Sequence, residues 1–138
     1  MANETEYESI LDSVKKLIGI DFNYHDFDAD IVIHTNTVLA NLVQMGIGPD
    51  EGFAITIDGN EKWEDFITDG DTNILSQVKS YVGLSVKTYF DPDASGILKE
   101  ARDAVLKELA YRMYVYMDNK KSTNKEAKQW IKMKHEII

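Results

Sequence analysis

Acidic residues at alternate positions are the first candidates for chemistry in this chain, because closely spaced carboxylates can bind calcium. Three clusters have that spacing, and they begin at Asp26, Asp69 and Asp91. A twelve-residue calcium loop needs a Gly at its sixth position for the turn and a Glu at its twelfth to close the coordination sphere. The third cluster has Gly96 at its sixth position but Arg102, a cation, at its twelfth, and the other two clusters have neither. We therefore predict no metal site and interpret these carboxylates as helix caps and solvated turns.

Other candidates for catalysis or cofactor binding are few. His25, His34 and His135 are too far apart for the i, i+4 pair of a helical metal site, and we interpret His34 as a residue at the edge of the core. The chain has no Gly-x-Ser-x-Gly motif and no Cys, and its Gly46-x-Gly48 motif follows a predicted helix rather than a strand. We predict no cofactor and no enzymatic activity. An enzyme would need titratable groups that converge only in the fold.

Charge divides the chain into an acidic body and a basic tail. Residues 1–118 contain 9 Lys and Arg against 22 Asp and Glu, whereas residues 119–138 contain 6 Lys against 2 Glu. The net charges are therefore −13 and +4. An acidic body repels nucleic acid, which argues against a DNA-reading domain. We predict one folded domain over residues 1–118 and a C-terminal tail over residues 119–138 that is flexible or ordered by a partner.

Length and composition predict one hydrophobic core. The chain has 138 residues, of which 43% are hydrophobic and 28% charged, as in ordinary globular proteins. No apolar run approaches the ~18 residues of a membrane span. The acidic N-terminus also lacks the basic and apolar regions of a secretory signal. We expect a protein that stays in the cytoplasm or is assembled there, with no membrane contact.

Helical periodicity dominates the body. Apolar residues recur at spacings of three and four in four segments, which cover residues 4–18, about 28–45, about 71–90 and about 95–118. In the first segment, Lys15 and Lys16 match the helix dipole, and Gly19 is a natural C-terminal cap. These segments predict four helices.

The connection between the second and third predicted helices has a different pattern. Gly46 and Pro49 end the second helix. Apolar residues then alternate from Phe53 to Ile57 and are followed by the turn Asp58-Gly59, which predicts a small hairpin. A single helical turn follows near Trp63. The expected fold class is thus mainly α: a four-helix body with a β-hairpin or extended excursion between helices two and three.

The second half of the last body helix is apolar on every side. Residues 109–117 read LAYRMYVYM, and only Arg112 interrupts them. A helix that is apolar all round must be covered all round. Either it packs on another helix of its own chain, or a neighbouring subunit covers it, since Tyr and Met are favoured at interfaces. For the second case, the candidate subunit-interface residues are Leu109, Tyr111, Met113, Tyr114 and Tyr116.

The basic tail has its own pattern. We predict a hinge over residues 119–124 and a detachable amphipathic helix after it. This helix could lie weakly on a membrane surface, dock in the groove of a partner, or remain a frayed end. For docking, the candidate residues are Lys128, Trp130, Ile131, Lys132 and Lys134.

Three packing and turn motifs, in this order and with these gaps, resemble the head-to-tail connector (adaptor) proteins of long-tailed bacteriophages. They are DIVIHTNTVLANLVQMGIGPDEGF at residues 30–53, Trp63-x-Asp65-Phe66, and VKSYVGLSVKTYFDPDAS at residues 78–95. The resemblance covers about residues 7–118, and the basic tail matches the family less well.

The resemblance implies a structural protein of the virion that is assembled in the host cytoplasm. It implies a ring of copies that binds the portal protein, extends the DNA channel without specific DNA binding, and offers a platform for the next neck or tail component. The tail is a candidate for docking on the portal. An alternative is a small phage DNA-packaging or regulatory protein that uses its basic tail on nucleic acid.

Overall fold

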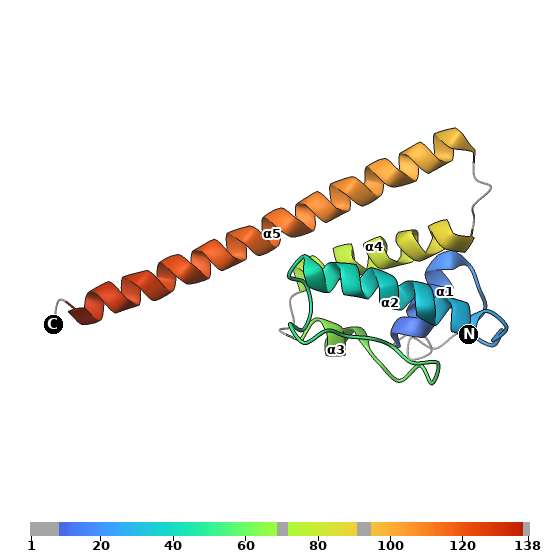
Figure 1. Cartoon of the computed structure of the whole chain (residues 1–138), viewed down its shortest axis with the longest axis horizontal. Coiled ribbons are helices and arrows are strands. Elements are labelled where there is room, and N and C mark those ends of the chain that lie inside the picture. Colours follow the sequence, from blue (N-terminus) through green and yellow to red (C-terminus); the bar gives the residue numbers. More distant parts are fainter. Residues whose placement is uncertain (1–8, 69–71, 91–94, 137–138) are drawn as a thin grey trace.

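Five helices make up the fold within the part of the chain that the computed structural model describes, which is residues 9–68, 72–90 and 95–136 (Figure 1). Their bounds are α1 Ile10–Ile18, α2 Asp28–Gln44, α3 Trp63–Phe66, α4 Thr72–Phe90 and α5 Gly96–Glu136. The prediction of a mainly helical fold is confirmed. The count is five rather than four, because the helical turn expected near Trp63 forms the short helix α3.

α4 is the central helix of the body, because it packs against α1, α2 and α5. In Figure 1, α5 lies on one side of α4, and α1 and α2 lie on the other. Each long helix contributes apolar residues at the helical period to a single core. On α1, α2, α4 and α5 the buried apolar residues are Ile10, Leu11, Val14, Ile31, Val38, Leu39, Leu42, Ile74, Val78, Val82, Val86 and Met113.

Local signals determine both ends of α1. Ser9 caps its start with a side-chain hydrogen bond, and Gly19 closes its end at a φ of +84°, as predicted for that residue. The backbone N–H of Ile10 also donates to the carbonyl of Glu61 at 2.8 Å, which ties α1 to the chain that enters α3. The first part of the predicted helix, residues 4–8, lies outside the described residues.

The predicted β-hairpin between α2 and α3 was wrong. The segment Phe53–Ile57 forms no strand. The side chain of Asn36 on α2 donates to the Ile55 carbonyl at 3.1 Å and accepts from the Ile55 N–H at 2.7 Å. The Thr56 N–H donates to a carboxylate oxygen of Glu61 at 2.8 Å. Two side chains therefore take the place of a β-ladder.

The turn after α2 depends on a close approach. Gly46 and Gly48 have φ values of +88° and +93°, a region that other residues rarely adopt. A Cβ atom at Gly48 would lie 2.4 Å from Cε1 of the Phe66 ring. The absence of a side chain at Gly48 therefore lets α3 pack against the end of α2.

α5 runs without a break from Gly96 to Glu136, so the predicted helix end at Asp118 was wrong. At ~1.5 Å per residue its 41 residues span about 60 Å. Its middle lies along α4, and its C-terminal part extends beyond the body (Figure 1). α5 is continuous across residues 119–124, where we predicted a hinge. No Gly or Pro follows Gly96 to interrupt the helix. The division into a domain and a tail stays a prediction.

Candidate assembly surfaces

The structure separates the candidate interface residues of α5 into two groups. Met113 is fully buried, and Leu109 and Tyr116 pack half-buried against the core. By contrast, Tyr111 is 68% exposed and Tyr114 is 57% exposed. Leu109, Met113 and Tyr116 thus pack on their own chain. A role for any of the five residues at a subunit interface remains a prediction.

The division between these groups follows from helix geometry. At about 100° per residue, Tyr114 and Tyr111 are rotated by about 100° and 160° from Met113, and this places them away from the core. We call the exposed surface of Tyr111 and Tyr114 the tyrosine face. The half-buried residues of α5, among those whose side chains the structure describes, are Arg102, Leu106, Leu109, Ala110, Val115, Tyr116, Met117 and Lys120. Leu109, Tyr116 and Met117 pack against the core.

The first turns of α5 leave further apolar side chains uncovered. Ile97 is 82% exposed, and Leu98 and Val105 are about half exposed. Leu98 and Val105 recur with Met113 at the spacing of a helical stripe, which predicts that all three are buried. That part of the stripe was wrong, because α5 diverges from α4 toward its own start (Figure 1).

A groove lies where α5 diverges from α1 and α4. Its volume is about 310 Å³, and we call it the α1/α4/α5 groove. Its lining residues come from all three helices and are mainly apolar, with a hydroxyl and an ammonium group among them: Leu17, Ser80, Gly83, Leu84, Lys87, Val105 and Leu109.

Gly83 determines how closely α1 and α4 approach at this groove. A Cβ atom at Gly83 would lie 2.6 Å from Cδ1 and 2.9 Å from Cβ of Leu17. The second contact is with an atom next to the backbone, so any side chain at Gly83 would push the two helices apart. Leu17 is 46% exposed beside it.

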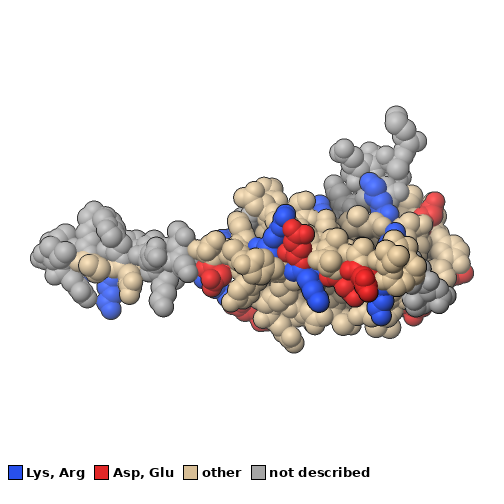
Figure 2. Space-filling model, turned by 90° about the horizontal axis from the view of Figure 1, so that it is seen from above, with Lys and Arg blue, Asp and Glu red and all other residues tan. Residues whose placement is uncertain are grey.

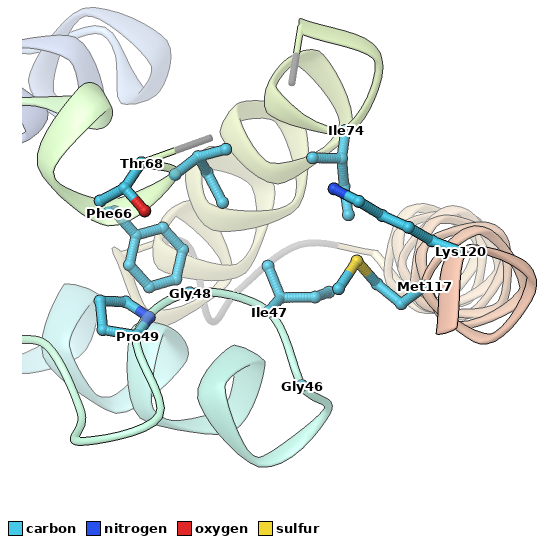
Figure 3. A pocket seen from close by; sticks show the side chains of 10 residues that line it. Gly46, Ile47, Gly48, Pro49, Phe66, Thr68, Ile74, Met117 and Lys120 are labelled. Carbon is cyan, nitrogen blue, oxygen red and sulfur yellow. The ribbon is translucent and has the colours of Figure 1, made fainter. Parts of the chain in front are cut away.

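A smaller cavity of about 140 Å³ lies where α5 meets the turn after α2 (Figure 3). Its walls include Ile47, Phe66, Ile74 and Met117, and Lys120 extends across it toward α4 in this view. Thr68 and Lys120 add polar groups to these apolar walls. The cavity marks the place where α5 is held against the body.

The most strongly buried charges form a bridge between α1 and α2 that the sequence analysis missed. Lys15 Nζ lies 2.8 Å from Oδ1 of Asp28, and it donates to the carbonyls of Phe22 and Tyr24 at 3.1 and 2.5 Å. His25 Nδ1 lies 2.8 Å from the other carboxylate oxygen of Asp28. This arrangement holds the loop between the helices closed.

The position of Lys15 offered a signal for this bridge. Lys15 is four residues after Leu11 and three before Ile18, so it lies on the apolar face of α1 and must find a buried partner. Its interpretation as a partner of the helix dipole was therefore incomplete. Burial raises the pKa of Asp28, but the hydrogen bonds and charges of Lys15 and His25 outweigh it, and the pKa is lowered.

His34 lies at the edge of the core, where it stacks on an aromatic ring. Its ring centroid is 4.2 Å from that of Tyr89, with an angle of 6° between the planes, and 5.7 Å from that of Phe90. Among the described residues, no group of three His, Cys, Asp or Glu side chains could hold a metal ion. The described part of the chain thus offers no constellation for metal chemistry.

The candidate tail residues all lie on the part of α5 that extends beyond the body. The Lys132 side chain is exposed. The side chains of Lys128, Trp130, Ile131 and Lys134 lie outside the described part of the structure. On the face shown in Figure 2, basic and acidic side chains are interspersed over the body.

Comparison with known proteins adds one finding. A family model described as "Phage connector protein" matches residues 10–120, from the start of α1 to just beyond Met117 of α5. No curated protein and no solved structure matches the chain. Within the described ranges, no helix combines the length and the apolar character needed to cross a membrane. The matched segment contains all of α1 to α4 and the part of α5 that packs on them.

Proposed function

The chain belongs to the phage connector protein family, and from this premise we propose that its copies form a ring between the portal and the tail of the virion. As a member of this family it is a structural protein of the phage neck. The ring extends the DNA channel and provides a platform for the next neck or tail component. The observation that carries this proposal is the family match over residues 10–120, which includes every helix of the body.

The chemistry of the described residues supports a role in assembly. Large apolar side chains on α5 are exposed, and they include Ile97, Tyr111 and Tyr114. Exposed apolar surface of this kind is a frequent mark of contact with other proteins. The net charge of −13 over residues 1–118 disfavours adhesion of DNA, as a channel through which DNA passes requires.

The function is tested in particles. A phage from which this gene is deleted should accumulate filled heads and free tails, and supplying the full chain in trans should restore joined virions. Electron microscopy of the particles and labelling of the chain at the neck provide the measurement. Normal joining without the chain would contradict the proposal.

The projecting end of α5 supplies the contact with the portal in this proposal. Its candidate residues are Lys128, Trp130, Ile131, Lys132 and Lys134, and residues 119–138 carry a net charge of +4. We expect truncation after Lys121 to weaken binding to the portal of the same phage and to leave the fold of the body intact. This cut is preferable to one after Asp118, because Lys120 lines the cavity beside Met117.

Pull-down with purified portal measures this effect, and circular dichroism of the truncated chain provides the control for folding. A second variant, with Lys128, Lys132 and Lys134 changed to Gln, keeps the helix and removes only charge. Unchanged portal binding by the truncated chain would exclude the tail as the docking element.

The net charge of the tail also favours a second candidate function, DNA packaging or regulation through contacts with phosphates. That function predicts duplex binding whose affinity falls steeply with salt, with a slope set by the number of lysines engaged. Fluorescence anisotropy with a labelled duplex at several salt concentrations separates the two candidates. For a connector we expect no binding at physiological salt.

A further inference from the structure

Two exposed apolar surfaces of this chain lie on opposite sides of the same helix. The tyrosine face contains Tyr114, and the α1/α4/α5 groove contains Val105. These residues are nine positions apart, which at about 100° per residue rotates one by half a turn from the other. Because α5 is continuous between them, neither surface can cover the other within one chain.

We propose that the tyrosine face of one copy docks in the α1/α4/α5 groove of the next copy. The inference rests on the proposed ring, and it names the surfaces through which neighbouring copies meet. Two different surfaces on opposite sides of a subunit make a heterologous contact, and repetition of such a contact closes a ring when the rotation between subunits permits.

The two surfaces fit one another chemically. The groove is lined by the apolar side chains of Leu17, Leu84, Val105 and Leu109, and Gly83 lets Leu17 pack closely on α4 at its edge. An aromatic ring contributes a large apolar area and prefers such a pocket, while its hydroxyl group requires a polar partner.

Polar groups stand where such partners are needed. Ser80 and Lys87 line the groove, and the ammonium of Lys87 can also interact with an aromatic face. Asp118 is exposed four residues after Tyr114, which places it on the tyrosine face. Lys107 and Lys121, seven residues before and after Tyr114, are exposed on the same face. The complementarity is therefore one specific pairing, of Asp118 on one copy with Lys87 on the next, and not a general difference in charge between the two surfaces. This pairing favours a second copy of the chain as the occupant of the groove.

The absence of Cys from the chain permits a direct test by disulfide cross-linking. Ser80→Cys places a thiol on the groove, and Lys107→Cys places one beside the tyrosine face, one turn before Tyr111. Both substitutions leave the apolar groups of the two surfaces in place. The two variants are mixed as concentrated full-length chains and oxidised, and the double variant is oxidised in the same way.

We expect the mixture to give a covalent heterodimer and the double variant to give a ladder of higher oligomers. Each single variant alone should stay largely uncross-linked. A dimer formed by Lys107→Cys alone would indicate a symmetric contact between tyrosine faces and would overturn the proposal. No product from the mixture would overturn it as well. Cross-linking of particles that carry the double variant repeats the test in the assembled neck.

A matched pair of substitutions measures the contribution of the tyrosine face. Tyr114→Ala should weaken self-association at least about tenfold, as the loss of an aromatic anchor does. Ile33→Ala is the control, since Ile33 is 61% exposed on α2 and belongs to neither surface. Equal effects of the two changes would contradict the proposal. If the chain is found at the virion neck but these contacts fail, the inference is wrong and the proposed function stands.

Discussion

The body and the projecting part of α5 show two ways in which a helix can exist in a protein. In the body, α4 is surrounded by α1, α2 and α5, and the residues that face it are buried at the helical period. The C-terminal part of α5 extends past the body without another helix beside it (Figure 1). The body therefore owes its structure to tertiary packing, whereas the projecting part depends on helix propensity alone.

This difference matches the limits of the family comparison. The family model ends at residue 120, close to the point where α5 passes beyond the body. The packed core thus lies within the matched segment, and most of the projection lies outside it. The comparison predicts that changes in the body alter stability, and that changes in the projection alter binding.

A cavity-forming substitution should have the largest effect. Leu39 is fully buried on α2, so Leu39→Ala should lower the free energy of unfolding by about 3–4 kcal/mol. Urea denaturation followed by circular dichroism gives this value. Met133→Ala, on the exposed surface of the projecting helix, is the matched control and should change it by less than about 0.5 kcal/mol. A large effect at Met133 would show that the projection belongs to the folding unit.

Loss of the buried ion pair should be nearly as costly. Asp28→Asn leaves the ammonium of Lys15 buried without its carboxylate, and we expect a loss of about 3 kcal/mol at pH 7. The carbonyls of Phe22 and Tyr24 still accept hydrogen bonds from Lys15. The loss of unfolding free energy should therefore lie at the lower end of the range for buried ion pairs that lose one partner. Asp30→Asn, on the exposed surface of the same helical turn, is the control and should have little effect.

The effect of Asp28→Asn should depend on pH. The pKa of Asp28 is lowered from its ordinary value of 3.8, so its carboxylate stabilises the fold fully above that value. This contribution is lost as the pH falls through the lowered pKa of the folded state. The difference in stability between wild type and Asp28→Asn should therefore shrink as the pH falls below about 4. A difference that grows in acid would exclude the ion pair as its cause.

A smaller effect is expected where a glycine permits close packing. Gly48→Ala should cost about 2 kcal/mol, because it adds strain at a φ of +93° to a contact with the Phe66 ring. Gly52→Ala has a similar φ of +97° and open space around it, so it should cost only about 1 kcal/mol. Thermal denaturation of the two variants separates the cost of backbone strain, which both share, from the cost of the contact with Phe66, which only Gly48→Ala adds. Equal losses of stability would mean that the Phe66 ring moves aside freely.

Local periodicity was sufficient to predict the helices of the body. The buried stripe of α2, with Ile31, Val38 and Leu42 among its members, could be predicted because the spacing of apolar residues reports directly on the face that meets the core. The alternation from Phe53 to Ile57 was misleading, because a strand needs a partner that no local pattern supplies. The partner that exists is the side chain of Asn36, 19 residues earlier on α2.

The candidate site was predictable only in part for the same physical reason. The apolar run on α5 indicated that both of its sides needed cover, but it did not say which side the body takes. That choice depends on the angle at which α5 crosses α4, and it buries Met113 while it exposes Tyr111 and Tyr114. The groove beside Gly83 joins α1 to α4 and α5, which lie far from it in sequence, so no motif marks it.

The predicted end of the last helix at Asp118 was wrong because a fall in apolar content signals the loss of a packing partner, not the end of a helix. Residues after Asp118 include Lys, Glu, Ala, Gln and Met, which favour the helix on their own.

The difference between losing a packing partner and ending a helix leads to the prediction with the smallest effect on global stability. A proline at Ala127 should interrupt α5 locally and change the stability of the body by less than about 0.5 kcal/mol.

The reason is that a proline inside a helix costs about 3 kcal/mol only when the chain must stay helical there. At Ala127 the projecting end can unfold instead, so the cost falls on the projection and not on the core. Ala110→Pro lies where α5 packs on the body and should destabilise the whole fold by about 3 kcal/mol. Thermal denaturation followed by circular dichroism compares the two variants. Ala127→Pro should lower the helical signal of the folded protein at low temperature and leave the midpoint of unfolding unchanged. Equal shifts of the midpoint would mean that the core and the projection unfold as one unit, and that a partner is not needed to explain why the projection is helical.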